Sequence, residues 1–130
     1  MKHLFPLILA ASLCLSAAPI ASEAPAKGAI HTIGVDDFAQ LIQQSHICLL
    51  DVRTAKEYAD DHIPNATLID ISQPDFLPKT THLPDTIAIY CRSGKRSLKA
   101  AQLLAPRGHT LYNLEGGILA WQKAGKPTVK

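Results

Sequence analysis

The 130-residue chain lacks the features of several protein classes. Its 13 Lys and Arg residues against 11 Asp and Glu residues leave a formal net charge of only +2, which is too small to indicate nucleic-acid binding. No internal repeat occurs, and the histidines show no metal-ligand spacing, being scattered over positions 31, 46, 62, 82 and 109. These absences favour one compact domain that needs neither a metal nor an organic cofactor.

An apolar run long enough to cross a membrane is also missing. Residues 4–18 form the longest such run, which follows Lys2 and His3 and ends in small residues. A basic start, an apolar stretch and a small-residue end are the layout of a secretory signal peptide. The run is shorter than the roughly 20 residues that a spanning helix needs. We therefore expect residues 1–26 to be a signal peptide, with no stable membrane insertion after cleavage.

The small residues around the end of this segment place its cleavage site. We expect the cut after Ala26, and Ser22 is an alternative. Cys14 would suggest lipidation, but Leu13 stands before it, where a lipoprotein signal requires a small residue. The sequence thus predicts an exported, periplasmic mature chain of residues 27–130.

A cysteine at the end of an apolar run is the most informative feature of the chain. Residues 86–90 are apolar and β-branched, Cys91 follows them, and a polar loop leads to a helical pattern that begins at about Ser97. Loop N–H groups, the positive end of a helix dipole and nearby cations all favour a thiolate over a thiol. An inert buried cysteine is the alternative, but this loop is too polar to cover one. We therefore predict that Cys91 is a nucleophile.

The loop after Cys91 supplies the groups that a sulfur-containing anion needs. Its backbone N–H groups can surround a negative sulfur, and its three cations can compensate the charge of an anionic substrate. One or more of these cations could equally be a solvated charge at a helix start. The predicted substrate-binding residues are Arg92, Ser93, Gly94, Lys95, Arg96 and Ser97.

Predicted strands alternate with predicted helices along the chain. This order is typical of an α/β domain with a parallel central sheet of about five strands and helices on both faces. A loop with three prolines at residues 72–84 has room for one helical turn. The expected strands are residues 31–33, 47–52, 66–69, 86–90 and 110–114, and the expected helices are residues 35–43, 54–58, 97–105 and 117–124.

Ligands of parallel sheets bind at the carboxyl ends of the strands, where both Asp51 and Cys91 are expected. Asp51 either hydrogen-bonds the loop in a supporting role or is a buried carboxylate paired with a cation. We expect Arg53 and Glu57 to form a local ion pair, and Thr54 and Glu57 to form a capping box. His62 is better explained as a hydrogen-bonded turn residue than as a general base.

Removal of a signal peptide would leave two cysteines, Cys48 and Cys91. Two cysteines in an exported protein usually suggest a disulfide. However, Cys48 lies three residues before Asp51, which we place level with Cys91 on the adjacent parallel strand. That separation is roughly 10 Å, more than the roughly 7 Å that a disulfide allows. We expect both thiols to be free.

Four motifs of the sequence resemble those of the rhodanese (sulfurtransferase) domain, and they occur in the order typical of that family over about residues 33–127. The whole chain is similar to the small, single-domain, exported bacterial members of that family. Asn65 stands where the family usually has glycine, and Asn tolerates the left-handed turn. The motifs are Asp51-Val52-Arg53 with Glu57-Tyr58, His62-Ile63-Pro64-Asn65-Ala66, the Cys91 loop, and Leu114-Glu115-Gly116-Gly117 with Ala120-Trp121.

The resemblance implies a function for Cys91. It would accept a sulfane sulfur from thiosulfate, a polysulfide or a persulfide, and pass it from its own persulfide to a thiophilic acceptor such as cyanide or a thiol. The backbone of residues 92–97 would hold the terminal sulfur, and the cations of the loop would hold the donor anion. The resemblance implies neither a metal nor another cofactor.

Two other functions compete with this one. Cysteine phosphatases and arsenate reductases have five residues between cysteine and arginine, whereas four separate Cys91 from Arg96 and position 97 is Ser. The shorter loop fits a sulfur atom better than a tetrahedral oxyanion. The other alternative is a periplasmic sulfur carrier that serves a protein partner, and it would use Cys91 in the same way.

Overall fold

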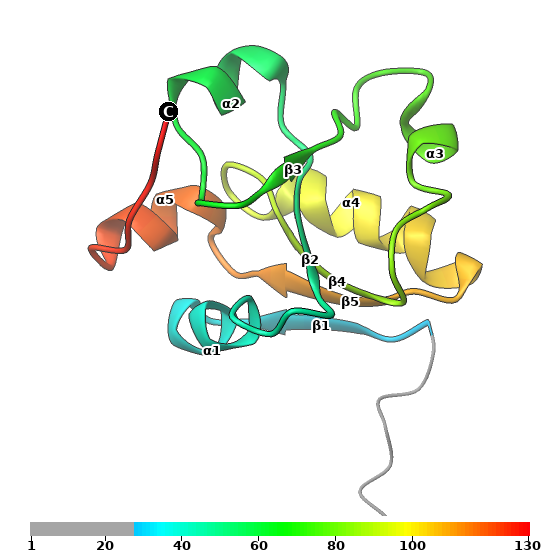
Figure 1. Cartoon of the computed structure of the whole chain (residues 1–130), viewed down its shortest axis with the longest axis horizontal. Helices are drawn as coiled ribbons and strands as arrows, with labels where there is room; N and C mark the ends of the chain where they lie inside the picture. Colours follow the sequence, from blue (N-terminus) through cyan, green and yellow to red (C-terminus); the bar gives the residue numbers. More distant parts are fainter. Residues whose placement is uncertain (1–27) are drawn as a thin grey trace, which may run out of the picture.

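The computed structural model describes residues 28–130, so the predicted signal peptide and its cleavage site lie outside the described part. Strands and helices alternate along this part (Figure 1). They are β1 (Ile30–Ile33), α1 (Val35–Leu41), β2 (Cys48–Asp51), α2 (Ala55–Asp60), β3 (Thr67–Leu68), α3 (Phe76–Lys79), β4 (Thr86–Tyr90), α4 (Lys95–Leu104), a 3-10 turn (Ala105–Arg107), β5 (Thr110–Leu114) and α5 (Gly117–Lys123).

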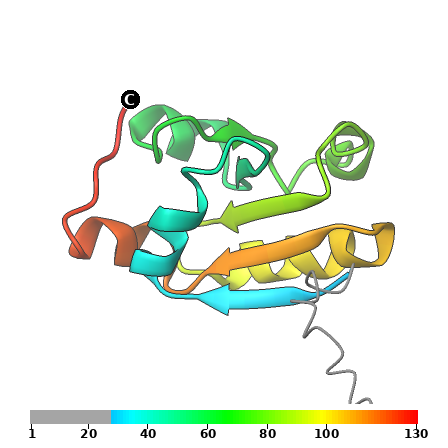
Figure 2. The same ribbon diagram turned by 60° about the horizontal axis from the view of Figure 1, so that its bottom comes forward.

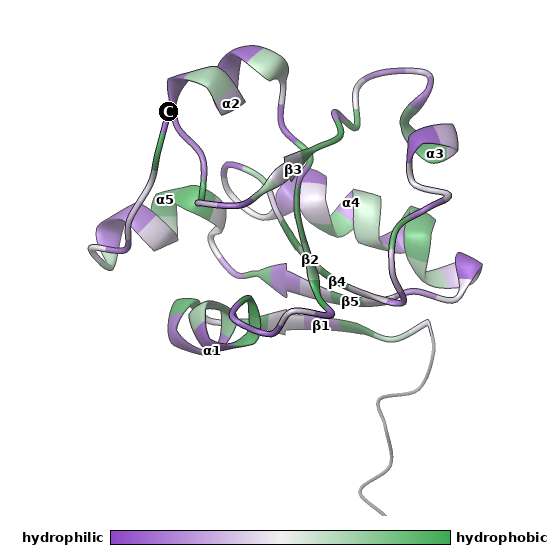
Figure 3. Cartoon of the chain, viewed as in Figure 1, coloured by the Kyte–Doolittle hydropathy of each residue, from purple (hydrophilic) through white to green (hydrophobic). Residues whose placement is uncertain are grey.

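The strands of residues 28–130 form one five-stranded sheet in the order β1-β5-β4-β2-β3. All neighbouring strands are parallel. Strands β2 and β4, the near-continuous apolar runs of the sequence, are buried except at their first residues, as expected for strands covered on both faces. Figure 3 shows these apolar residues along β2 and β4 in the middle of the molecule.

Each face of the sheet has its own core, because successive side chains of a strand point to opposite faces. Ile87 and Ile89 of β4 pack with α4, whereas Ala88 and Tyr90 pack with α1 and α5. Figure 2 shows α4 on the side of the strands opposite to α1. The predicted α/β fold, with a parallel sheet and helices on both faces, is therefore confirmed. Cys91 belongs to the α4 side.

Several local predictions are also confirmed. Thr54 and Glu57 form the capping box that starts α2. Asn65 has a φ of 70°, in the left-handed region. The loop over residues 72–84 contains the single helical turn α3. Among residues 28–130, no helix has both the length and the apolar character required to cross a bilayer.

Two predictions about position were wrong. Helix α4 begins at Lys95 instead of about Ser97, because Gly94 caps it with a φ of 102°. Of the residues at helical spacing, Leu98, Ala101, Gln102 and Ala105, that suggested its apolar face, Ala101 and Ala105 are buried, whereas Leu98 and Gln102 are exposed. The residues that α4 buries are Ser97, Ala100, Ala101 and Leu104.

The expected register between the two central strands was off by one position. Asp51 is opposite Tyr90, and not level with Cys91. Cys48 is opposite Ile87, four positions before Cys91 along β4, and both cysteines are free. The larger offset strengthens the argument against a disulfide.

Candidate active site

Cys91 follows the last residue of β4 directly, at the carboxyl edge of the sheet. Its side chain is 1% exposed. The Cys91 Sγ atom accepts a hydrogen bond from the backbone N–H of Gly94 at 3.1 Å. The Ser97 hydroxyl also lies within donating distance of Sγ, at 3.4 Å. The positive φ of Gly94 folds the loop back over the cysteine, which places these two donors around one sulfur.

The N-terminus of α5 holds the loop from the other side (Figure 1). The N–H groups of Ile118 and Leu119 donate to the carbonyl oxygens of Cys91, at 2.9 Å, and of Arg92, at 3.2 Å. In a trans peptide the carbonyl and the following N–H point in opposite directions. Binding of these carbonyls to α5 therefore turns the N–H groups of Arg92 and Ser93 away from α5.

Gly117 makes this close approach possible. It has a φ of +60°, and an added Cβ atom would lie 2.6 Å from the Cys91 carbonyl oxygen and closer still to that of Arg92. No other residue fits between α5 and the loop. The Gly-Gly pair of the fourth sequence motif is thus explained by contact with the cysteine loop.

Hydrogen bonding makes Cys91 more acidic than an ordinary cysteine. Burial alone raises the pKa of the Cys91 thiol, because it removes water from the anion. Hydrogen bonds from the Ser97 side chain and from the backbone of Ser97, Gly94 and Ser93 outweigh the burial, so the net pKa is lowered. The site therefore stabilises a thiolate without exposing it.

The three loop cations differ in their surroundings. Arg96 is bound through both guanidinium ends to Glu57 of α2, at 2.7 and 2.8 Å. The hydrogen bond from Arg96 lowers the pKa of Glu57 to about 2. Glu57 is therefore ionised at neutral pH, and both members of the pair carry their charge. Arg92 and Lys95 are exposed, and neither takes part in a salt bridge among the described residues. Two of the three cations are thus open to an incoming anion.

Arg53 and Glu57 do not form the ion pair that we expected, since each has a partner elsewhere. Asp51 is fully buried and accepts hydrogen bonds from the Arg53 side chain at 2.7 to 3.1 Å. Within residues 28–130, none of the hydrogen bonds that the Asp51 carboxylate accepts comes from the loop over 92–97. The second interpretation of Asp51, a buried carboxylate paired with a cation, agrees with this arrangement.

The remaining predicted positions are structural. His62 Nδ1 lies 2.9 Å from the Tyr58 carbonyl oxygen, and the two rings stack. Trp121 is 3% exposed and donates from Nε1 to the Pro127 carbonyl. His62 is therefore hydrogen-bonded as expected, but it lies in an isolated bridge with Val129, just before the turn at residues 64–65.

Sequence reasoning missed one residue of the site, Asn113 of β5. Its side chain is 3% exposed, and its Oδ1 atom accepts a hydrogen bond from the Ser97 hydroxyl at 2.6 Å. The available signal was a lone amide in a strand whose neighbours are Tyr112 and Leu114. A polar residue at such a buried position requires a partner.

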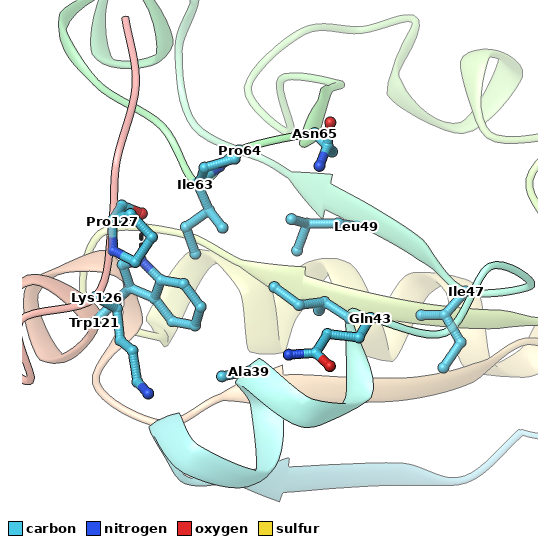
Figure 4. A pocket seen from close by; sticks show the side chains of 11 residues that line it. Ala39, Gln43, Ile47, Leu49, Ile63, Pro64, Asn65, Trp121, Lys126 and Pro127 are labelled. Carbon is cyan, nitrogen blue, oxygen red and sulfur yellow. Dashed lines mark hydrogen bonds between the residues drawn. The ribbon is translucent and has the colours of Figure 1, made fainter.

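Among the hollows on the surface of the described part, two differ in whether they include a residue of the cysteine loop. The larger, of about 410 Å³, lies between α1, the turn at residues 63–65 and the segment after α5 (Figure 4). It is mostly apolar and contains no residue of the loop over 91–97. The smaller, of about 220 Å³, includes Arg92 and Leu119. Among residues 28–130, no group of three or more His, Cys, Asp or Glu side chains could hold a metal ion.

Comparison with known proteins gives consistent matches. The family described as "Rhodanese-like domain" matches residues 34–124. A sulfurtransferase of Allochromatium vinosum is 38% identical over 69% of this chain and 85% of its own length. An uncharacterized protein of Synechocystis is 40% identical over 76% of this chain, but the match spans only 56% of that protein. The crystal structure of a rhodanese-related protein from Thermoplasma volcanium has a TM-score of 0.69 at 31% identity, covering 76% of this chain and 97% of the other.

Proposed function

Because the chain belongs to the rhodanese-like domain family, we propose that it is a sulfurtransferase in which Cys91 carries the transferred sulfur. The observation that carries the proposal is the cysteine itself, which ends a buried strand with hydrogen-bond donors gathered around its sulfur. These donors lower the pKa of Cys91, and the thiolate is the form that attacks sulfur. The sulfurtransferase name of the Allochromatium relative supports the same activity.

The first step would take sulfur from thiosulfate, a polysulfide or a persulfide. With thiosulfate, the Cys91 thiolate attacks the terminal sulfur, the S–S bond of thiosulfate breaks, and sulfite leaves with the electron pair. Two anions meet in this step, so positive charge near Cys91 stabilises the transition state. Arg92 and Lys95 can supply it, because their side chains are exposed and outside the salt bridges of the described residues.

The second step would release the sulfur to a thiophilic acceptor. Cyanide or a thiolate attacks the outer sulfur of the persulfide, and the Cys91 thiolate leaves with the electron pair of the S–S bond. The donors that lower the pKa of Cys91 make it a better leaving group. Between the two steps, the N–H groups of the loop would hold the negative outer sulfur.

Loss of thiocyanate formation in a Cys91→Ser variant tests this function. The assay supplies thiosulfate as the sulfur donor and cyanide as the acceptor, and circular dichroism checks that the variant is folded. The wild-type protein should form thiocyanate and should carry one extra sulfur on Cys91 by mass spectrometry after treatment with thiosulfate. A variant that retains more than a trace of turnover, or a wild-type protein without the added sulfur, would refute the proposal.

A second candidate is a sulfur carrier that serves a protein partner. It is favoured by Leu119, an apolar side chain that is 43% exposed and lies in the small hollow with Arg92. A carrier would load sulfur on Cys91 in a single turnover but would form thiocyanate slowly in the steady state. Comparison of these two rates in one preparation separates the two functions.

We also propose that the chain works after export, because the signal peptide predicted over residues 1–26 implies it. N-terminal sequencing of the protein recovered from the periplasm should begin at Lys27, or at Glu23 if Ser22 is the cleavage site. Recovery of the unprocessed chain from the cytoplasm alone would contradict export.

A further inference from the structure

The Ser97 hydroxyl has more hydrogen-bond acceptors than it has protons. It is fully buried, and three acceptors surround it. The Asn113 Oδ1 atom lies at 2.6 Å, the Gly94 carbonyl oxygen at 3.1 Å and the Cys91 Sγ atom at 3.4 Å. A serine hydroxyl has only one proton to donate. The three acceptors therefore compete for it.

The distances indicate which acceptor makes the tighter contact with the hydroxyl. A separation of 2.6 Å is short for a hydrogen bond between a hydroxyl and an oxygen acceptor. Sulfur is a larger acceptor atom than oxygen, so the 3.4 Å separation from Cys91 Sγ is an ordinary hydrogen-bond length and not a short one. The Asn113 amide is oriented for this role, because its Nδ2 atom donates to the Gly94 carbonyl at 3.4 Å while Oδ1 faces Ser97. The neutral amide oxygen thus occupies the donor that a negative sulfur would use.

We propose that Asn113 is a positioning residue that competes with Cys91 for the Ser97 hydroxyl proton and so limits how strongly the site stabilises the Cys91 anion. The competition suits a sulfur that changes charge during turnover. In the thiolate the charge is on Sγ, which draws the proton away from Asn113. In the persulfide the charge is on the outer sulfur, and the proton returns to the Asn113 oxygen.

The competition for the Ser97 proton concerns the Cys91 thiol and does not depend on the proposed function. Only the role of this competition during turnover rests on that function. The ionisable groups on the elements around Cys91 are unchanged by substitutions at Asn113, so a changed titration cannot come from a lost charge. They include Arg92, Lys95, Arg96 and Lys99 in the loop and α4, Lys56, Glu57 and Asp60 in α2, Asp51 at the end of β2 with Arg53 after it, Asp70 after β3, Tyr90 in β4, and Glu115 after β5.

The test measures the rate of Cys91 alkylation by iodoacetamide as a function of pH, without any sulfur donor. Asn113→Ala and Asn113→Leu both remove the competing oxygen, and Leu retains most of the volume. We expect the alkylation midpoint to fall by about one pH unit in both variants, as for one hydrogen bond gained by a charged group. Cys48→Ser in the protein processed after Ala26 is used as the common background, so that Cys91 is the one cysteine left.

Two further variants make the test specific. In a Ser97→Ala background there is no proton to compete for, so substitution of Asn113 should leave the midpoint unchanged. Thr110→Ala serves as a matched control, because Thr110 is a buried polar residue at the opposite end of β5. It should leave the midpoint at the wild-type value.

Three results would overturn the inference. They are an unchanged midpoint in folded Asn113 variants, a raised midpoint, which would mean that Asn113 donates to Ser97, and an equal shift in the Ser97→Ala background. Failure of the proposed function would look different, since a protein that forms no persulfide could still show the predicted alkylation shifts.

Discussion

Cys91 combines two properties that usually exclude each other, near-complete burial and a stabilised anion. Water stabilises most thiolates, and here hydrogen-bond donors of the loop replace it. The donors come from Gly94 and Ser97, which lie three and six residues after the cysteine. The groups that would make Cys91 reactive could therefore be recognised from a local stretch of sequence.

Removal of the Ser97 hydroxyl should make Cys91 less acidic. The hydrogen bond from the Ser97 side chain lowers the pKa of Cys91, so Ser97→Ala should raise it, by up to about one unit. Less thiolate is then present below the new pKa, and the acidic limb of the sulfurtransfer profile moves to higher pH. Thiocyanate formation measured between pH 5 and 10 checks this. Activity at high pH should recover, and a uniform loss at every pH would contradict the explanation.

Gly117 should tolerate no side chain. Gly117→Ala places a Cβ atom against the Cys91 and Arg92 carbonyls and forces alanine into a left-handed conformation. We expect a loss of about 3 kcal/mol in the free energy of unfolding, measured by urea denaturation, together with slower alkylation of Cys91. Gly108→Ala is the matched control, since Gly108 has a φ of +96° but open space around it. It should cost only about 1 kcal/mol, and equal losses would argue against the contact.

Other residues of the site could not be identified from the sequence, because their partners are distant along the chain. Arg96 and Glu57 are 39 positions apart, and the sequence offered the nearer Arg53 as a partner for Glu57. Asn113 is 16 positions from Ser97 and looks like an isolated polar residue in a strand. Only the register of β4 against β5 brings Asn113 to the loop.

At the scale of elements, the salt bridge between Glu57 and Arg96 connects α2 to the first turn of α4, next to the cysteine loop. Glu57→Gln should release the Arg96 side chain, while glutamine at this position can still complete the capping box with Thr54. A free Arg96 adds a third cation for the donor, so the KM for thiosulfate should fall about two- to fivefold. Steady-state kinetics at low ionic strength measures it, because salt screens such contacts.

A control separates this effect from a general change of charge. Asp75→Asn removes a carboxylate from an exposed salt bridge with Lys79 in α3. The KM for thiosulfate should remain at the wild-type value in that variant. An unchanged or higher KM in Glu57→Gln would mean that Arg96 serves α2 alone and does not reach the donor.

Whether a segment is a helix or a strand could be predicted more accurately than the residues at which it begins and ends. The capping box gave the start of α2 correctly, since its two side chains are only three residues apart in the sequence. The start of α4 was placed about two residues late, because a left-handed Gly94 at the N-cap has no side-chain signal. The register between β2 and β4 was off by one position, since both strands are apolar throughout and show no alternation that would fix it.

At the scale of the whole molecule, the alternation of strands and helices was sufficient to predict a parallel α/β sheet. The order β1-β5-β4-β2-β3 was not predicted, because it depends on how each crossover packs. The hollow of about 410 Å³ was likewise hidden from the sequence. Its wall combines α1 with residues 63–65 and the segment after α5, which the fold alone brings together.

The whole-molecule arrangement predicts that the two cysteines of residues 28–130, Cys48 and Cys91, never pair. Cys48 is opposite Ile87, so four residues at about 3.3 Å each place it about 13 Å below Cys91, beyond the roughly 7 Å limit for a disulfide. Burial also raises the pKa of Cys48, which keeps it as an unreactive thiol. The protein processed after Ala26 should therefore show two free thiols when it is denatured without reductant and any persulfide has been removed, and Cys48→Ser should retain sulfurtransfer. A count of zero thiols would require β2 and β4 to slide past each other, and would reject the register on which the site depends.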